Sequence, residues 1–490
     1  MHRFKAMMSS VDMTEGKPWR KLLAFTLPLL IGNMFQQLYG LVDAIMLGNW
    51  VGVHALAAVT STIPIMFIMM VFLIGIAMGA GVMVSQYFGA KKREELSRTI
   101  GVSITLTTLL GAVIAIFGPM GTRWLLVLLD TPSEIVDYSV IYINILMWGI
   151  LGMGYFNIFS GILRGVGEAF SPLLYLICAC LLNIVLNFIF IWVLGLGVMG
   201  AAIGTVMAQG ATAILCLRKM RQMKDIFDMK WSYLIPQKAF VKQVLRLGVP
   251  TGASQAVFAV AMIVVQPLVN GFGLLVLAAN NIVMKIDGLV MMPNFSFGNA
   301  MTVYAGQNMG AGKPERVSQG TRQCLMLAFG TAFILVIILL IFGRGIAGWF
   351  TDIDEVLDLS VRFIRILAAG YLAFSVNIVL WGTIRGAGDA MTPMYAAMLN
   401  TVLIRVPSAF LFVRWLGRPE ALIYSLLLGW VCNTLLAVIS YRIGKWRKAG
   451  LVKKEETETN SPNPITDGEE NEGDVMQDET PEDIKEDEHT

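Results

Sequence analysis

Two stretches decide the fold: G-I-L-R-G-V-G-E-A-F-S-P at 161–172 and G-T-I-R-G-A-G-D-A-M-T-P at 382–393. They lie 221 residues apart (382 − 161 = 221), and the same offset lays Q-Y-F-G-A-K-K-R-E at 86–94 on Q-N-M-G-A-G-K-P-E at 307–315. A match at one fixed offset is an internal repeat, so the chain consists of two similar halves.

The composition places these halves in a membrane. Of 490 residues, 56% are hydrophobic and only 14% are charged, which leaves too little polar surface to cover a soluble globule. Apolar runs of about 20 residues, long enough to cross a bilayer core of about 30 Å, recur about twelve times between Lys21 and Lys445. The predicted fold is an all-α polytopic membrane protein with two six-helix lobes. Because matching segments carry their Lys and Arg on the same side, the repeat is parallel.

The basic residues also predict the organisation along the chain. Lys and Arg gather in alternate connections, which the positive-inside rule places in the cytoplasm together with both termini. We expect a cytoplasmic N-terminus (1–20), a first lobe (21–218), a basic cytoplasmic linker (219–246), a second lobe (247–445) and an acidic, disordered cytoplasmic tail (446–490). Anionic membrane lipid explains the basic loops, so no nucleic acid is expected as a partner.

Several signals of soluble enzymes are missing from the pattern. The R-G-V-G-E and R-G-A-G-D segments follow no predicted strand and lack the spacing of a phosphate-binding loop. We interpret each as the end of a helix and a tight cytoplasmic turn, with Pro172 or Pro393 opening the next helix. The five cysteines lie inside apolar runs without zinc-ligand spacing, which is typical of packing residues. We therefore expect no enzyme activity and no cofactor.

Asp43 is the carboxylate that stands out. A charged group near the middle of a spanning helix costs about 3 kcal/mol, so such residues usually face a cavity and have a function. Gln36, Tyr39, Asp43 and Met46 follow one another at spacings of three and four, which places them on one helix face. A carboxylate near the outer end that caps a neighbouring helix is the alternative. Pro28, in the same apolar run, predicts a kink.

Two further helices carry polar pairs one turn apart. Asn183 and Asn187 lie on the fifth predicted helix, and Thr205 and Gln209 on the sixth. Together with Asp43 they could form one polar cluster in the first lobe. Hydrogen bonding between helices is the simpler explanation that stays open.

The second lobe has one comparable acid. Lys285 and Asp287 interrupt the eighth predicted helix and, being two residues apart, point to different faces. Asp287 is our second candidate for a coupling carboxylate, and a structural ion pair between the lobes is the alternative. The thirty methionines include, on this interpretation, some that give a cavity an adaptable apolar wall.

At this point the sequence resembles the MATE (multidrug and toxic compound extrusion) family, in its bacterial branch. The resemblance covers residues 15–445 and rests on P-L-L-I-G-N-M-F-Q-Q-L-Y-G-L-V-D-A-I-M-L-G at 28–48, on the paired R-G-x-G-[ED]-A turns and on the paired Q-x-x-G-A loops. It implies two six-helix bundles around a central cleft in the bacterial cytoplasmic membrane. It also implies export of lipophilic organic cations by a monomer, driven by inward H+ or Na+.

The resemblance also implies a cation site in the first lobe. The family's Asp on the first helix, Tyr one turn before it, Asn and Asp on the fifth helix and Thr on the sixth match Asp43, Tyr39, Asn183, Asn187 and Thr205. Asn187 departs from the family pattern, because the second carboxylate is missing. This departure weakens a Na+ site at Asp43, Asn183, Asn187 and Thr205 and favours H+.

In other branches of the family a second-lobe site uses acids on the seventh and tenth helices. This sequence has no acid at those places on its seventh and tenth predicted helices, and the polar residues nearest to them are Gln255 and Asn377. Our remaining candidates for the substrate cleft are Gln36, Met46, Gln209, Gln255 and Asp287.

The expected function is a cation-coupled antiporter that exports drugs by alternating access of two lobes. Protonation of Asp43 from outside would release the substrate, because a carboxylate shared by substrate and proton binds them differently in the two states. The alternative is a flippase for a lipid-linked or amphipathic metabolite, which should line its cleft with Arg or Lys. Few predicted spans carry basic residues, Lys285 and Arg405 being the main ones. A channel or receptor lacks support, since no selectivity filter or soluble ligand-binding domain appears.

Overall fold

The computed structural model describes residues 11–129 and 131–452, and these residues form helices without strands. The predicted acidic tail, from residue 453 on, lies outside the described residues, as do the first ten residues of the predicted N-terminus. Within the described part, 11 helices are long and apolar enough to cross a membrane, or up to 12 if the bent pair of α5 (Ser133–Trp148) and α6 (Ile150–Gly165) is one span. The prediction of an all-α protein with about twelve spans is confirmed.

The first half of the chain contains α2 (Pro18–Trp50), α3 (Val53–Gly89), α4 (Arg93–Leu128), α5 (Ser133–Trp148), α6 (Ile150–Gly165), α7 (Phe170–Asn187), the π-helix η1 (Phe188–Val193) and α8 (Gly197–Gln222). The second half contains the 3₁₀ turn η2 (Trp231–Leu234), α9 (Lys238–Gly271), α10 (Leu274–Gly310), α11 (Pro314–Gly348), α12 (Asp354–Gly386), α13 (Met391–Leu399), the π-helix η3 (Asn400–Arg405), α14 (Val406–Leu416), α15 (Glu420–Ile443) and the 3₁₀ turn η4 (Lys445–Lys448).

The chain bends where small residues permit close contact. Helices α5 and α6 meet at an angle of 50° at Gly149, where a side chain would lie within 2.8 Å of the Val206 side chain on α8. The R-G-x-G turns have the predicted form: Gly167 and Gly388 have φ of +86° and +107°, a conformation that glycine adopts without strain.

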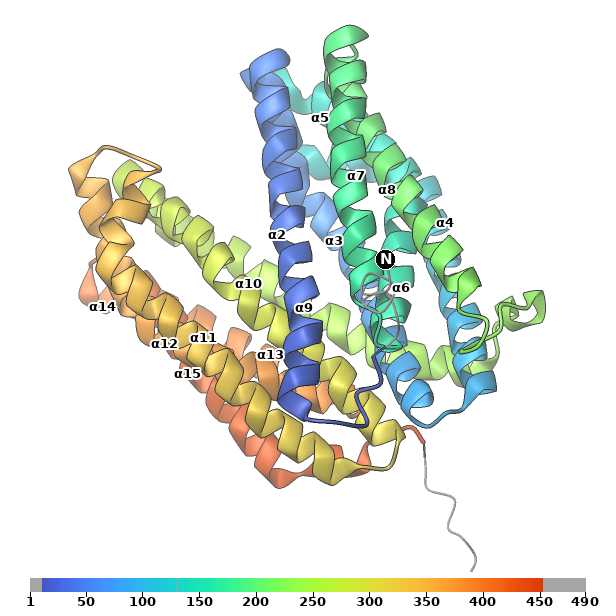
Figure 1. The fold of residues 1–490 in the computed structure, drawn as a ribbon. Coiled ribbons are helices and arrows are strands. Elements are labelled where there is room, and N and C mark those ends of the chain that lie inside the picture. The colour runs from blue at the N-terminus through green and yellow to red at the C-terminus, as the bar shows by residue number, and fades with distance from the viewer. Residues whose placement is uncertain (1–10, 130, 453–490) are drawn as a thin grey trace, which may run out of the picture. The chain divides into compact units, whose positions relative to one another are not determined.

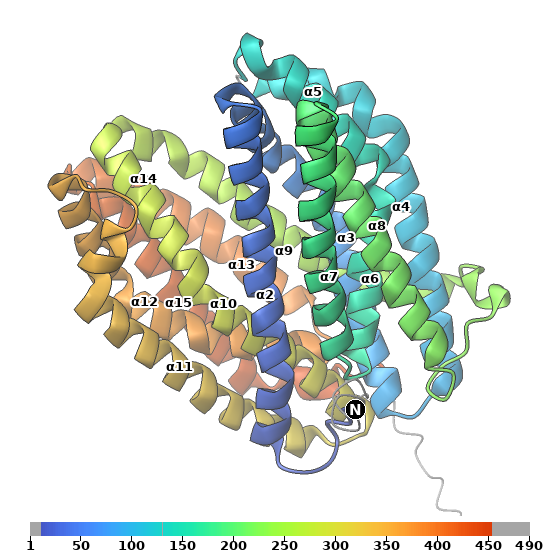
Figure 2. The same cartoon turned by 45° about the horizontal axis from the view of Figure 1, so that its top comes forward.

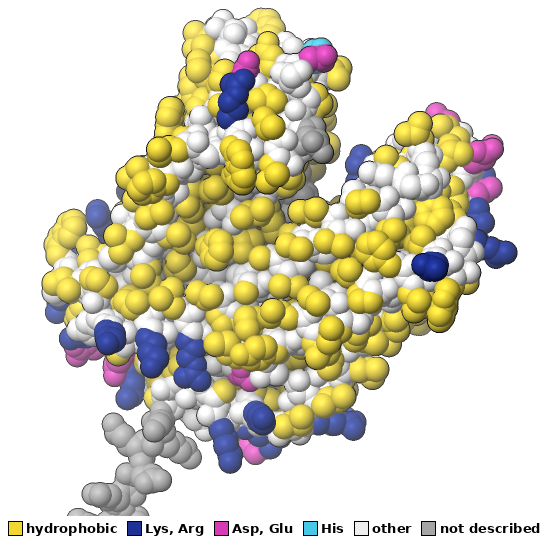
Figure 3. Space-filling model, turned by 180° about the vertical axis from the view of Figure 1, so that it is seen from behind, with side chains coloured by type: hydrophobic (Ala, Val, Ile, Leu, Met, Phe, Trp, Pro, Cys, Tyr) yellow, Lys and Arg dark blue, Asp and Glu magenta, His cyan; other side chains and the backbone are white. Residues whose placement is uncertain are grey.

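Helices α2–α8 and α9–α15 form two arms (Figures 1 and 2). The arms join at the end that carries the basic loops, which we call the basic end, and separate at the opposite, open end. Figure 3 shows hydrophobic side chains over both arms, a hollow between them, and Lys and Arg gathered at the basic end. An apolar belt above a basic rim is the surface that a bilayer requires.

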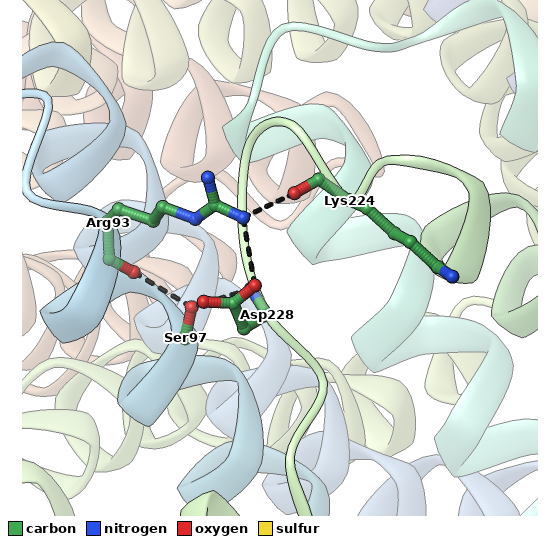
Figure 4. Close-up of polar contacts among 4 residues, drawn as sticks. All are labelled: Arg93, Ser97, Lys224 and Asp228. Carbon is green, nitrogen blue, oxygen red and sulfur yellow. Dashed lines mark hydrogen bonds and ion pairs between the residues drawn. The ribbon is translucent and has the colours of Figure 1, made fainter.

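The linker between the two arms is pinned to α4. It spans residues 223–237, shorter than the expected 219–246 because α8 and α9 extend into that stretch. Arg93 Nη2 donates to Asp228 Oδ1 at 2.8 Å, and the backbone N–H of Asp228 donates to Ser97 Oγ at 2.9 Å (Figure 4). The connection between the arms therefore has a defined path on the first one.

The repeated glutamines join the arms at the basic end. Gln86 Nε2, on α3, donates to the carbonyl of Gly386 in the second lobe at 2.9 Å. Gln307 Nε2, on α10, donates to the carbonyl of Gly165 in the first lobe at 3.1 Å. Since both pairs are related by the offset of 221 residues, the contact is the same one made twice. We call these two glutamines and two carbonyls the seam.

Small residues and the chain ends complete the seam. A Cβ atom on Gly89 or Gly310 would lie 1.9 or 1.8 Å from a backbone oxygen of the other lobe, so only glycine fits there. The backbone N–H of Met13 donates to Oε1 of Gln307 at 2.9 Å, and that of Leu451 donates to Oε1 of Gln86 at 2.7 Å. Segments from both ends of the body thus cover the basic end.

Candidate functional site

Asp43 is buried in the first lobe, with 9% of its surface exposed, and other polar side chains surround it. Asn187 Nδ2 donates a short hydrogen bond to Asp43 Oδ1, and Thr205 Oγ1 donates to Oδ2 at 3.4 Å. These contacts join α2 to the last residue of α7 and to α8. Asn187 directly precedes the π-helix η1, and π-helical turns occur frequently at functional sites.

Asn183 closes the cluster. Its Oδ1 accepts from Asn187 Nδ2 at 3.2 Å, and its Nδ2 donates to Thr205 Oγ1 at 3.5 Å. The structure therefore brings together the four residues that the helical spacing and the resemblance had singled out. We call Asp43, Asn183, Asn187 and Thr205 the Asp43 cluster.

Two tyrosines border the Asp43 cluster. The hydroxyl of Tyr39 is buried near Asp43 and Thr205 and makes no hydrogen bond of normal geometry with the described residues. Tyr142 on α5 is also buried and close enough to Asp43 to interact with its charge. Sequence reasoning missed Tyr142, because it lies about a hundred residues from Asp43 and nothing in the sequence links the two positions.

A glycine gives the Asp43 cluster its room. A Cβ atom on Gly204 would lie 2.4 Å from Oδ1 of Asn187, so a larger residue on α8 would displace the amide. That oxygen is buried and has no hydrogen-bond partner among the described residues. The cluster thus offers carboxylate, amide and hydroxyl oxygens but only one negative charge. This donor set suits a proton on Asp43 or a hard cation such as Na+.

A cavity of about 370 Å³ lies between the lobes, lined by α2, α3, α6, α7, α9, α10 and α12. Gln36 and Gln255, two predicted cleft residues, line it, as does Pro28. Its polar lining also includes Asn33, Asn157, Ser160, Thr251, Asn299 and Thr302. No Asp or Glu belongs to the described lining, whereas Arg164 and Arg385 do.

The other predicted cleft residues lie elsewhere. Met46 is buried with 7% exposure, and Gln209 is half-buried on α8 away from the cavity lining. Asp287 accepts a short hydrogen bond from the hydroxyl of Tyr371 on α12. This partner belongs to the same lobe, and the described residues include no ion pair between Asp287 and the other lobe. The sequence could not identify a partner 84 residues away.

Lys285 and Arg405, the basic residues that the sequence places in second-lobe spans, face aromatic rings. Lys285 Nζ lies 5.3 Å from the ring centre of Phe350, and the guanidinium of Arg405 lies 5.1 Å from that of Phe258. Both are cation–π contacts, which hold a positive charge without a counter-ion.

Arg164 and Arg385 are residues that the sequence assigned to cytoplasmic turns. Each precedes its glycine pair but still belongs to the last turn of α6 or α12, so its side chain reaches the cavity. A signal was present: the two positions are equivalent in the repeat (385 − 164 = 221), and basic residues are rare in the spans.

Two helical lobes related by a repeat, with a cavity between them, are the architecture of a class of membrane transporters. The family model named MatE matches residues 28–189 and 250–411, one copy in each lobe. The chain belongs to the MATE family, whose members are transporters and not enzymes.

Curated relatives and solved structures agree with this assignment. A probable multidrug resistance protein of Bacillus subtilis, YoeA, is 31% identical over 438 residues, covering 85% of this chain and 94% of its own. A MATE structure in the bent conformation has a TM-score of 0.84 at 23% identity, covering 90% of this chain and 99% of its own. A MATE transporter structure described as outward-facing has a TM-score of 0.83 at 24% identity, with 90% and 99% covered. The chain is thus a multi-pass multidrug efflux transporter.

Proposed function

We propose that this transporter exports lipophilic organic cations in exchange for H+, with Asp43 as the coupling carboxylate. The observation that carries the proposal is the buried Asp43 cluster on α2, α7 and α8. Its place of action would be a bacterial cytoplasmic membrane, with both termini in the cytoplasm and a monomer as the working unit.

Protonation would change the contacts of Asp43. As a carboxylate it accepts hydrogen bonds from Asn187 and Thr205, and such charge-assisted bonds are about twice as strong as neutral ones. A proton removes the charge and turns one oxygen into a donor, so the bonds that join α2 to α7 and α8 must rearrange. Substrate and proton then favour different arrangements, which is the condition for exchange.

The choice of H+ over Na+ rests on Asn187. An amide there supplies oxygen but no charge, so Asp43 alone would neutralise a bound cation. Hard cations bind more tightly as the number of charged oxygen ligands rises. Na+ coupling through Asp43, Asn183, Asn187 and Thr205 is the alternative within this proposal.

The test is ethidium efflux from drug-sensitive cells, with the pH gradient and the Na+ gradient collapsed separately. We expect wild type to export, loss of export when the pH gradient is removed, and no export by Asp43→Asn. Asp137→Asn is the matched control, because Asp137 is exposed and only pairs with Arg123 at 3.0 Å. Efflux that follows the Na+ gradient would replace H+ by Na+. Efflux by Asp43→Asn equal to wild type would refute the role of Asp43.

One observation favours a second candidate function. A flippase for a lipid-linked or amphipathic metabolite was expected to line its cleft with basic residues, and Arg164 and Arg385 line this cavity. The candidate predicts transbilayer movement of a fluorescent anionic lipid in vesicles containing the protein. No movement above that of empty vesicles would dismiss it.

A further inference from the structure

The two arginines of the central cavity have no counter-ion within residues 11–129 and 131–452. Arg164 and Arg385 come from equivalent positions of the two lobes and line the same space of about 370 Å³. Among the described residues neither side chain has a hydrogen-bond or ion-pair partner, and the cavity lining contains no Asp or Glu. Two positive charges therefore face a space without a negative one.

Burial of an unpaired guanidinium group costs more free energy at Arg385 than at Arg164. Its Nε atom is buried and makes no hydrogen bond within the described chain. Leaving a buried polar group unpaired is destabilising, and more so when the group is charged. Cation–π contacts of the kind that hold Lys285 and Arg405 do not occur at Arg164 or Arg385 in the described structure. The described structure therefore supplies no partner for the positive charge of Arg385, and a bound anion would supply one.

The position of the arginines is defined by the seam. The carbonyl of Gly165, the residue after Arg164, accepts from Gln307, and that of Gly386, the residue after Arg385, accepts from Gln86. Each guanidinium is therefore carried by a helix end whose backbone is fixed across the two lobes. A site built on such fixed elements is held in place before a ligand arrives.

We propose that Arg164 and Arg385 form an anion-binding subsite at the basic end of the cavity, which takes the carboxylate or phosphate group of an amphipathic substrate. The guanidinium fork matches the geometry of both groups. Phe156, Leu176, Phe295 and Ile378 on the same walls provide apolar surface for the rest of the molecule. The proposal rests on the proposed export function, and adds to its organic cations those that also carry a carboxylate or phosphate group.

A matched pair of dyes tests the subsite. Rhodamine 110 carries a free carboxylate, and rhodamine 123 is its methyl ester, so the pair differs only in that group. Binding is measured by fluorescence anisotropy on the purified full chain in a neutral detergent, without any ion gradient. We expect wild type to bind rhodamine 110 about tenfold more tightly, the effect of one charge-assisted hydrogen bond.

The variants then assign the preference to the arginines. Arg164→Gln and Arg385→Gln should each reduce the preference for the acid while the affinity for the ester stays within about twofold, a change too small to count as a lost interaction. Retained ester binding also shows that the variants fold. Arg385→Lys should keep part of the preference, because it keeps the charge. Arg365→Gln, an exposed position on the same helix α12, is the control and should behave as wild type.

Three results would overturn the subsite: wild type that does not prefer the acid, a preference unchanged in both glutamine variants, or equal weakening of acid and ester. Phosphatidylglycerol vesicles identify the source of the anion. If they displace rhodamine 110 from wild type, the subsite takes a lipid phosphate, and if they do not, it takes a soluble carboxylate. A wild type that shows no preference for the acid but keeps pH-driven ethidium efflux refutes the subsite alone. An intact preference without efflux refutes the proposed export alone.

Discussion

The two lobes share a scaffold but not their carboxylates. At the seam every contact is doubled, since Gln86 and Gln307 make equivalent bonds to Gly386 and Gly165. Asp43, in contrast, has Val264 at the equivalent position of the second lobe (43 + 221 = 264). Its surroundings differ too: Asp43 has donors on two other helices, whereas Asp287 has the hydroxyl of Tyr371.

This difference separates two tasks. The contacts that close one end of the molecule involve both lobes equally, and a repeat supplies the same contact from each lobe. An ion-coupling site needs one charge in one place, and a second copy would bind a second ion. We therefore expect the symmetric parts to govern which end is closed and the Asp43 cluster to govern what drives the change.

The largest expected effect contrasts the two carboxylates. If Asp43 is shared by substrate and proton, substrate binding to the purified protein in weak buffer should release protons, detected with a pH-indicator dye. Asp43→Asn should abolish this release, because an amide holds no exchangeable acid proton at this position. Asp287→Asn should retain most of it. Equal loss in both variants would mean that the lobes share the coupling, and loss in Asp287→Asn alone would move it to the second lobe.

The next effect probes the room around Asn187. In Gly204→Ala the new methyl group would occupy the space 2.4 Å from Asn187 Oδ1, so the amide must leave its bond to Asp43. Loss of a charge-assisted hydrogen bond predicts ethidium efflux about tenfold slower. Gly210→Ala on the same helix is the control, because a Cβ atom there meets nothing within 4 Å. Equal rates in the two variants would contradict a coupling role for Asn187.

A smaller effect concerns the coupling ion. Asn187→Asp restores the second carboxylate of the family pattern next to Asp43. With two charged oxygen ligands we expect Na+ to stimulate ethidium efflux about two- to fivefold at constant pH, while wild type responds little. The measurement is the efflux rate against external Na+, with choline as the replacement ion. A variant as insensitive as wild type would show that charge at this position does not select the ion.

The sequence predicts the scaffold well, and for physical reasons. Apolar runs of membrane-crossing length, the alternation of basic loops and the single repeat offset are all local or periodic features, and they predict two six-helix lobes. The Asp43 cluster was also predictable, because its residues are polar in apolar helices, Asn183 and Asn187 lie one turn apart, and the family resemblance names these positions.

What the sequence could not supply is the direction of side chains at helix ends and the identity of distant partners. The sequence around Arg164 and Arg385 does not show whether their side chains point to solvent or, as in the structure, into the cavity. Tyr371 lies in an apolar helix, and only the structure shows that its hydroxyl donates to Asp287 in a different span. Gly204 reads as one of many small residues until the position of Asn187 is known.

The smallest effect tests the symmetric half of the comparison. Gln86→Ala and Gln307→Ala each remove a donor to the other lobe and an acceptor for a chain-end segment, which costs about 1–3 kcal/mol of local stability. Amide hydrogen exchange in the turns at 165–169 and 386–390 should accelerate in both variants to a similar degree. Gln222→Ala, an exposed position at the end of α8, should leave it unchanged. If one variant alone accelerated exchange, the two equivalent contacts of the seam would contribute unequally to stability. The repeat would then no longer explain how the basic end is held closed.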